Sequence, residues 1–122
     1  MLWLMSDPDK LSGKARAAIE VSRTNGEGIS VCDITLLELT TLASGGRIRL
    51  GISLESLLLE VESRFVVLPI SSRACARAMS FPTTYPKDPA DRIIGATALV
   101  EGLSLITADR EIRRSKLIPT IW

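Results

Sequence analysis

The stretch DPADRIIGATALVEGLSLITAD, residues 88–109, decides the fold because it encodes a helix, a turn and a strand in direct succession. Asp88 is a favoured N-cap residue, and Pro89 suits the first position of a helix. Asp91 adds a negative charge to the first turn, where the helix dipole favours it. Gly102 then ends the predicted helix, and the short apolar run after it is typical of a buried strand.

The same alternation of helix and strand extends outward over the rest of the chain. Alternating elements of this kind imply a parallel sheet covered by helices on both faces, a three-layer α/β fold in a single domain of residues 1–122. In such sheets ligands bind beyond the carboxyl ends of the strands. We expect helices over residues 14–23, 33–43, 54–63, 72–79, 89–101 and 109–114, and strands over residues 29–32, 65–70, 103–107 and 117–121.

Composition narrows the chemistry that this domain can perform. The 122 residues include no histidine, which excludes Ser-His-Asp and Cys-His catalysis and histidine-ligated zinc. Cys32 and Cys75 form no metal-binding pair and are expected to be reduced thiols. No apolar segment is long enough to span a bilayer, so the protein is expected to be cytoplasmic and free of the membrane. Carboxylates, hydroxyls and basic side chains remain as candidates.

Three carboxylates follow strands or open the helix after a loop. Glu38 lies on the helix after the strand 29–32, Asp91 on the first turn of its helix, and Asp109 just past the strand 103–107. The ends of parallel strands meet at one edge of a sheet, so these acids are expected to converge there. Because clustered carboxylates repel one another, such a site favours a divalent cation.

Each acid also has a purely local explanation, which remains open at this point. Glu38 can complete a capping box with Thr35, and Asp91 can simply complement the helix dipole. Asp109 can be the N-cap of the short helix that follows, and Asp88 is assigned mainly to capping. Convergence of the acids would need a cation such as Mg²⁺ or Mn²⁺, which takes oxygen ligands and can promote phosphodiester hydrolysis without histidine.

The chain resembles the PIN domain family, and within it the VapC-type ribonuclease toxins of bacterial toxin–antitoxin pairs. The similar stretches follow the order and spacing of that family over nearly all of the chain, and the last two are the most specific. They are residues 2–12, 29–31 with 37–39, 47–51, 88–98 and 102–109.

The resemblance implies a parallel α/β domain that cuts RNA with Mg²⁺ or Mn²⁺, forms homodimers and is bound by a cognate antitoxin protein. It assigns metal binding and catalysis to Glu38, Asp91 and Asp109. Other side chains are expected to support this site. Asp88, Thr35 and Thr107 are expected to support the ligands or to cap helices, and Arg92, Arg110, Arg113 and Arg114 to contact RNA phosphates.

One feature departs from the family pattern. Family members begin with a central strand that ends in the first metal-ligand Asp, whereas here residues 1–3 match the helix after that strand. Asp7 and Asp9 lie beyond that helix and cannot replace the ligand. We therefore expect a PIN-like sheet without its central first strand, which would leave unpaired backbone groups on two interior strands.

Two interpretations follow from this departure. Either the true start lies upstream of Met1 and the protein is an active endoribonuclease, or the chain is a catalytically impaired, N-terminally truncated PIN domain that binds antitoxin or RNA. A receiver-like signalling domain is a weaker alternative, because it would need a lysine after a late strand and only Lys116 is available.

Overall fold

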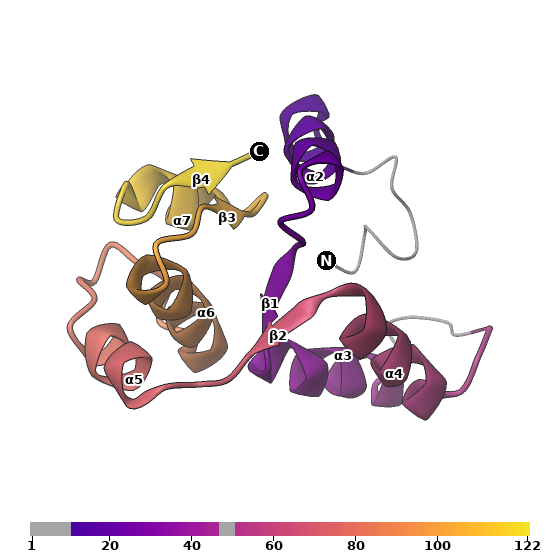
Figure 1. Ribbon diagram of the computed structural model, residues 1–122. Helices are drawn as coiled ribbons and strands as arrows, with labels where there is room; N and C mark the ends of the chain where they lie inside the picture. Colours follow the sequence, from indigo (N-terminus) through magenta and orange to yellow (C-terminus); the bar gives the residue numbers. More distant parts are fainter. Residues whose placement is uncertain (1–10, 47–50) are drawn as a thin grey trace.

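The computed structural model describes residues 11–46 and 51–122, and helices and strands alternate along them as the sequence predicts (Figure 1). Expectations for residues 1–10, including those for Asp7 and Asp9, and for residues 47–50 lie outside the described part. The helices are α2 (Gly13–Thr24), α3 (Ile34–Ser44), α4 (Leu54–Arg64), α5 (Ser72–Met79), α6 (Pro89–Val100) and α7 (Arg110–Ser115). The strands are β1 (Ser30–Cys32), β2 (Val66–Leu68), β3 (Leu105–Ile106) and β4 (Thr120–Ile121).

Side-chain caps determine where most of the helices begin. Ser12, Ser53 and Ser71 each accept a hydrogen bond of 3.1 Å from the backbone N–H three residues further on, which satisfies one of the free donors of the first turn. Asp88 caps α6 and Asp109 caps α7 in the same manner. These starting points confirm the boundaries that were predicted from the sequence.

Helix α6 ends in a turn that requires glycine. Gly102 has a φ of 68°, in the left-handed region that side-chain-bearing residues avoid. Its N–H bonds the carbonyl of Leu99 at 3.3 Å, and the N–H of Leu103 bonds the carbonyl of Ala98 at 2.8 Å. This pair of bonds forms a Schellman motif, which turns the chain from α6 toward β3.

Within residues 11–46 and 51–122, the strands form two separate parallel sheets rather than one. Strand β1 pairs with β2, with Ser30 opposite Val66 and Cys32 opposite Leu68, and β3 pairs with β4. The strands are shorter than predicted; β2 ends before Pro69, which has no N–H to donate to a neighbour. The expected α/β architecture of parallel strands flanked by helices is therefore present, but its sheet is split.

The facing edges of β1 and β3 carry backbone groups without partners among the described residues. In parallel pairing, alternate residues direct their N–H and C=O toward the same neighbour. The carbonyl of Ile29 accepts a hydrogen bond from β2, and the N–H of Asp33 donates one to β2. Cys32, the residue before Asp33, therefore directs its backbone groups away from β2. The N–H groups of Leu105 and Thr107 bond residues 119 and 121, so Ile106 also faces away from its partner strand.

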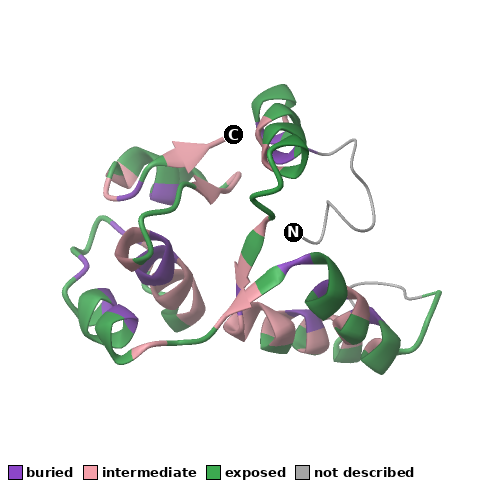
Figure 2. Ribbon diagram, viewed as in Figure 1, coloured by how far each residue is buried: buried purple, intermediate pink, exposed green. Residues whose placement is uncertain are grey.

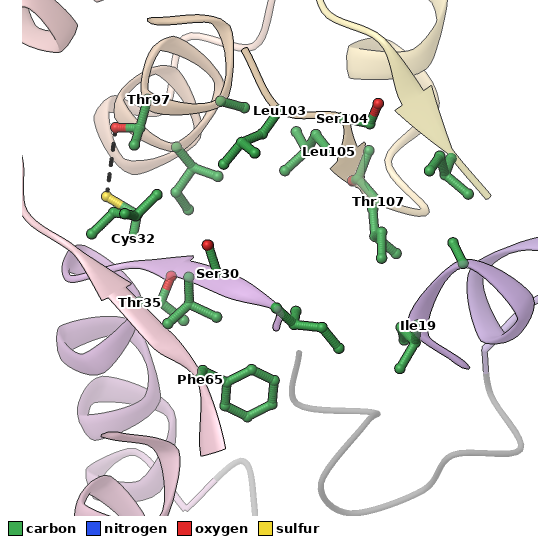
Figure 3. A pocket seen from close by; sticks show the side chains of 18 of the residues that line it. Ile19, Ser30, Cys32, Thr35, Phe65, Thr97, Leu103, Ser104, Leu105 and Thr107 are labelled. Carbon is green, nitrogen blue, oxygen red and sulfur yellow. Dashed lines mark hydrogen bonds between the residues drawn. The ribbon is translucent and has the colours of Figure 1, made fainter. Parts of the chain in front are cut away.

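A cavity of about 700 Å³ lies between these two edges. It is lined by Ser30 and Cys32 on one side and by residues 103–107 on the other, with Ile19 of α2 at one end (Figure 3). Its walls are mainly apolar, but Glu38 and Asp91 also line it. The split in the sheet therefore coincides with the edge at which the sequence predicts the acids.

Three buried clusters support this arrangement, and their buried positions face the inner sides of the helices (Figure 2). The largest joins α5, α6 and α7 around Tyr85, Ala96 and Ile118. Smaller clusters form around Ile19 of α2 and around Val61 of α4. Within residues 11–46 and 51–122, no helix is long and apolar enough to cross a membrane.

Candidate functional site

Glu38 reaches the cavity from α3, whose N-terminus follows directly from β1. The helix begins after Asp33, so Glu38 lies more than one turn into it and is half-buried. No hydrogen bond reaches its carboxylate from any residue in the described ranges, and the capping box with Thr35 is not formed. Thr35 instead lines the same cavity (Figure 3). Among the described residues, Glu38 is therefore a carboxylate without a hydrogen-bond partner at the cavity wall.

Asp88 and Asp91 both belong to the first turn of α6 but have different environments. One carboxylate oxygen of Asp88, Oδ1, accepts the N–H of Ala90 at 2.9 Å, so the predicted capping role is confirmed. Asp88 is exposed, whereas Asp91 is half-buried and lines the cavity. Helix α3 packs against α6, which brings Asp91 toward Glu38.

Asp109 follows β3 and caps α7. Its Oδ1 accepts the N–H groups of Glu111 at 2.9 Å and Ile112 at 3.1 Å. The hydroxyl of Thr107 accepts the N–H of Asp109 at 3.1 Å and so orients this turn, as expected of a supporting residue. The local explanation for Asp109 is thus correct, but it uses only Oδ1, and no described residue donates a hydrogen bond to Oδ2.

The acids influence one another electrostatically. Burial raises the pKa of Glu38, and the negative charges of Asp91 and Asp88 raise it further. Burial also raises the pKa of Asp91, with added contributions from Asp88, Asp109 and Glu111. In the described ranges none of these acids forms a salt bridge, so their repulsion is not offset by a basic side chain.

The donor chemistry of this cluster fits a hard divalent cation, since every candidate ligand is a carboxylate oxygen. The positions of these carboxylates, however, do not complete a metal site. Within the part of the chain that the structure describes, no three histidine, cysteine, aspartate or glutamate side chains converge closely enough to hold a metal ion. The structure therefore brings Asp91 within electrostatic range of Asp109 and Glu38 within range of Asp91, without assembling a finished metal site.

Arg92 has a role that the sequence did not predict. We expected it to contact phosphate, but its guanidinium instead bonds carbonyls of the loop before α6. Both terminal nitrogens are used in this way, so Arg92 is not oriented toward a ligand. The other candidate arginines, Arg110, Arg113 and Arg114, are exposed on α7 beside Asp109.

Two residues near the site were missed by the sequence analysis. Asp33 follows β1 directly, and its Oδ2 accepts the N–H of Ile70 at 3.3 Å, which ties the ends of β1 and β2 together. The rule that places acids after parallel strands could have identified it. Tyr85 lies in a proline-containing loop and is 1% exposed, with its hydroxyl 3.1 Å from the carbonyl of Asp91. No pattern in the sequence indicates that contact.

Two comparisons with known proteins show what this chain is similar to. A family model described as PIN domain matches residues 1–116 of the chain. Ribonuclease VapC22 from Mycobacterium tuberculosis is 35% identical over 122 residues, an alignment that covers 98% of this chain and 91% of the relative. Both similarities extend over the helices and strands that carry Glu38, Asp91 and Asp109.

Proposed function

The chain belongs to the PIN domain family, and from this premise we propose that it is a Mg²⁺- or Mn²⁺-dependent endoribonuclease, the toxin of a toxin–antitoxin pair. The observation that carries the proposal is that Glu38 and Asp91 line one cavity, with Asp109 close enough to Asp91 to raise its pKa, and without a basic counter-charge in the described part of the chain. A fold bears such repulsion at a cost, and a bound cation would remove it.

The similarity to a protein named Ribonuclease VapC22 supports RNA as the substrate. The composition supports a metal-dependent reaction, because a chain without histidine has no imidazole to act as a general base near neutral pH. A divalent ion supplies charge stabilisation for a scissile phosphodiester and activates water for attack. By resemblance, the partners are an antitoxin protein and a second copy of the chain, and the location is the cytoplasm.

The residues have distinct roles in this proposal. Glu38, Asp91 and Asp109 would hold the ion, and Oδ1 of Asp109 also caps α7. Asp88 and Thr107 keep the backbone of the two acid-bearing turns in place. Exposed arginines beside Asp109 provide positive charge for RNA phosphates. They are Arg110, Arg113 and Arg114.

A second candidate function is binding of RNA or antitoxin without cleavage. It is favoured by one observation, which is that no three acids in residues 11–46 and 51–122 converge closely enough for metal binding. In this alternative the acids would bind a cation weakly and would not support catalysis.

A nuclease assay with Mn²⁺ and single-stranded RNA separates the two candidates. We expect the protein to cut RNA, EDTA to stop the reaction, and Asp91→Asn to slow it by about 100-fold, which corresponds to about 2.7 kcal/mol. Glu62→Gln is the control. Like Asp91→Asn, this substitution replaces a carboxylate with an amide, but Glu62 is exposed on α4. Binding of RNA without cleavage by the unmodified protein would favour the second candidate.

A further inference from the structure

Arg92 fastens the loop before α6 to the helix itself. Its Nη1 donates to the carbonyls of Ala78 at 3.4 Å and Phe81 at 3.0 Å. Its Nη2 donates to the carbonyls of Pro82 and Tyr85, each at 3.3 Å. A guanidinium has four N–H bonds on its terminal nitrogens, so these four acceptors match them in number. A lysine, with one ammonium group, cannot reproduce this planar arrangement.

Tyr85 provides a second attachment between the same loop and the same helix. Its hydroxyl donates to the carbonyl of Asp91 at 3.1 Å, and its ring packs edge-on against Phe81 with centroids 4.8 Å apart. The ring sits directly over Gly95, where an added Cβ would collide with the Tyr85 hydroxyl and lie 2.8 Å from Cδ1 of Ile118. The contact is therefore tight, and the space for it exists only because residue 95 is glycine.

These attachments act on the first turn of α6, which carries Asp91. Successive residues of an α-helix are about 100° apart around its axis, so the side chains of Asp91 and Arg92 leave the helix in different directions. Asp91 lines the cavity, while Arg92 binds the loop on the other side. Holding Arg92 fixes the rotation of the helix about its axis and hence the direction in which Asp91 points.

We propose that Arg92 and Tyr85 are positioning residues, which hold the first turn of α6 so that Asp91 is directed at the cation site. The inference rests on the proposed function, because it assigns these residues to a metal-binding carboxylate. Neither side chain touches the cation or the substrate. A positioning residue of this kind changes the affinity for the metal by orienting a ligand.

Calorimetric titration with Mn²⁺ alone tests the proposal on the unmodified protein, Arg92→Lys and Tyr85→Phe. We expect Arg92→Lys to raise the Kd for Mn²⁺ by roughly 10–100-fold, the range seen when a ligand's supporting partner is lost. Tyr85→Phe keeps the ring over Gly95 and removes only the hydroxyl, so a smaller rise of about threefold is expected. Arg23→Lys is the matched control, since Arg23 is exposed in the last turn of α2.

The binding stoichiometry distinguishes positioning from a general structural role. A variant that merely contains fewer folded molecules would bind less Mn²⁺ with an unchanged Kd, whereas a positioning defect raises the Kd at full stoichiometry. An unchanged Kd in both variants would overturn the inference and leave the proposed function standing. If circular dichroism shows that Arg92→Lys is unfolded, the Kd of Tyr85→Phe decides alone. Failure of the unmodified protein to bind Mn²⁺ would overturn both proposals.

Discussion

On one side of α6, the guanidinium of Arg92 binds carbonyls of the loop before the helix, and Tyr85 of that loop packs over Gly95. On the other side, Asp91 lines a cavity of about 700 Å³ between two sheet edges that are not paired with each other. The first side satisfies its polar groups within the protein. The second leaves carboxylates facing one another without a partner in the described chain.

The contrast teaches how a small domain can keep like charges close together. Repelling carboxylates separate if their backbone is free to move, so the segments that carry them need support from elsewhere in the fold. In α6 this support comes from four carbonyl hydrogen bonds to Arg92 and from the packed ring of Tyr85. The side of α6 that Arg92 and Tyr85 hold, which we call the closed side, therefore supports Asp91 on the cavity side, which we call the open side.

Gly95→Ala should produce the largest loss of stability, because its new methyl group must displace Tyr85 or Ile118 on the closed side. We expect the free energy of unfolding in urea to fall by about 1–3 kcal/mol, the usual cost of overpacking a core. Gly13→Ala is the control, since a Cβ at this helical position meets nothing within 4 Å. Equal stability of the two variants would show that the closed side is more adaptable than its geometry indicates.

Amide hydrogen exchange tests the open side directly. The alternation of parallel pairing directs the N–H groups of Cys32 and Ile106 away from their partner strands, whereas those of Asp33 and Thr107 donate to a neighbouring strand. We expect the first pair to exchange at least about tenfold faster than the second, because exchange follows the free energy of opening. Nuclear magnetic resonance measures these rates residue by residue. Equal protection would mean that the two edges are covered in solution.

Glu38→Gln should produce a small gain in stability at neutral pH. Burial and the charge of Asp91 raise the pKa of Glu38, so the folded protein binds this proton more tightly than the unfolded chain does. Above the raised pKa, the charged carboxylate lowers the free energy of unfolding. This effect disappears as the pH falls to the ordinary pKa of 4.5. For a half-exposed group we expect about 0.5 kcal/mol, or about 2 °C in Tm, at pH 7.

Thermal melts of Glu38→Gln and the control Glu62→Gln at pH 7 and pH 4 check this sign. The stabilising effect should appear only for Glu38→Gln and only at the higher pH, because Glu62 is exposed on α4. Addition of Mn²⁺ should remove the advantage by neutralising the charge in the unmodified protein. Destabilisation at pH 7 would show that Glu38 has a favourable partner.

Much of the fold was predictable because its signals are local. Caps at Ser12, Ser53 and Asp88 mark helix starts through the backbone donors of a single turn, and the structure confirms them. The capping of α7 by Asp109 was likewise foreseen as one alternative. The role of Arg92 was not, because three of its four acceptors are set by the path of a loop that contains two prolines and no periodic pattern.

The sequence by itself determined the alternation of helices and strands, the carboxylates that follow them and the absence of imidazole chemistry, since each depends on residue type and short spacing. Only the tertiary structure decided that the described strands form two sheets and that the acids of α3 and α6 line the space between them. It also decided that Arg92 donates hydrogen bonds to carbonyls of the loop before α6. These outcomes depend on which segments, distant in sequence, are packed together, and packing is a property of the whole chain.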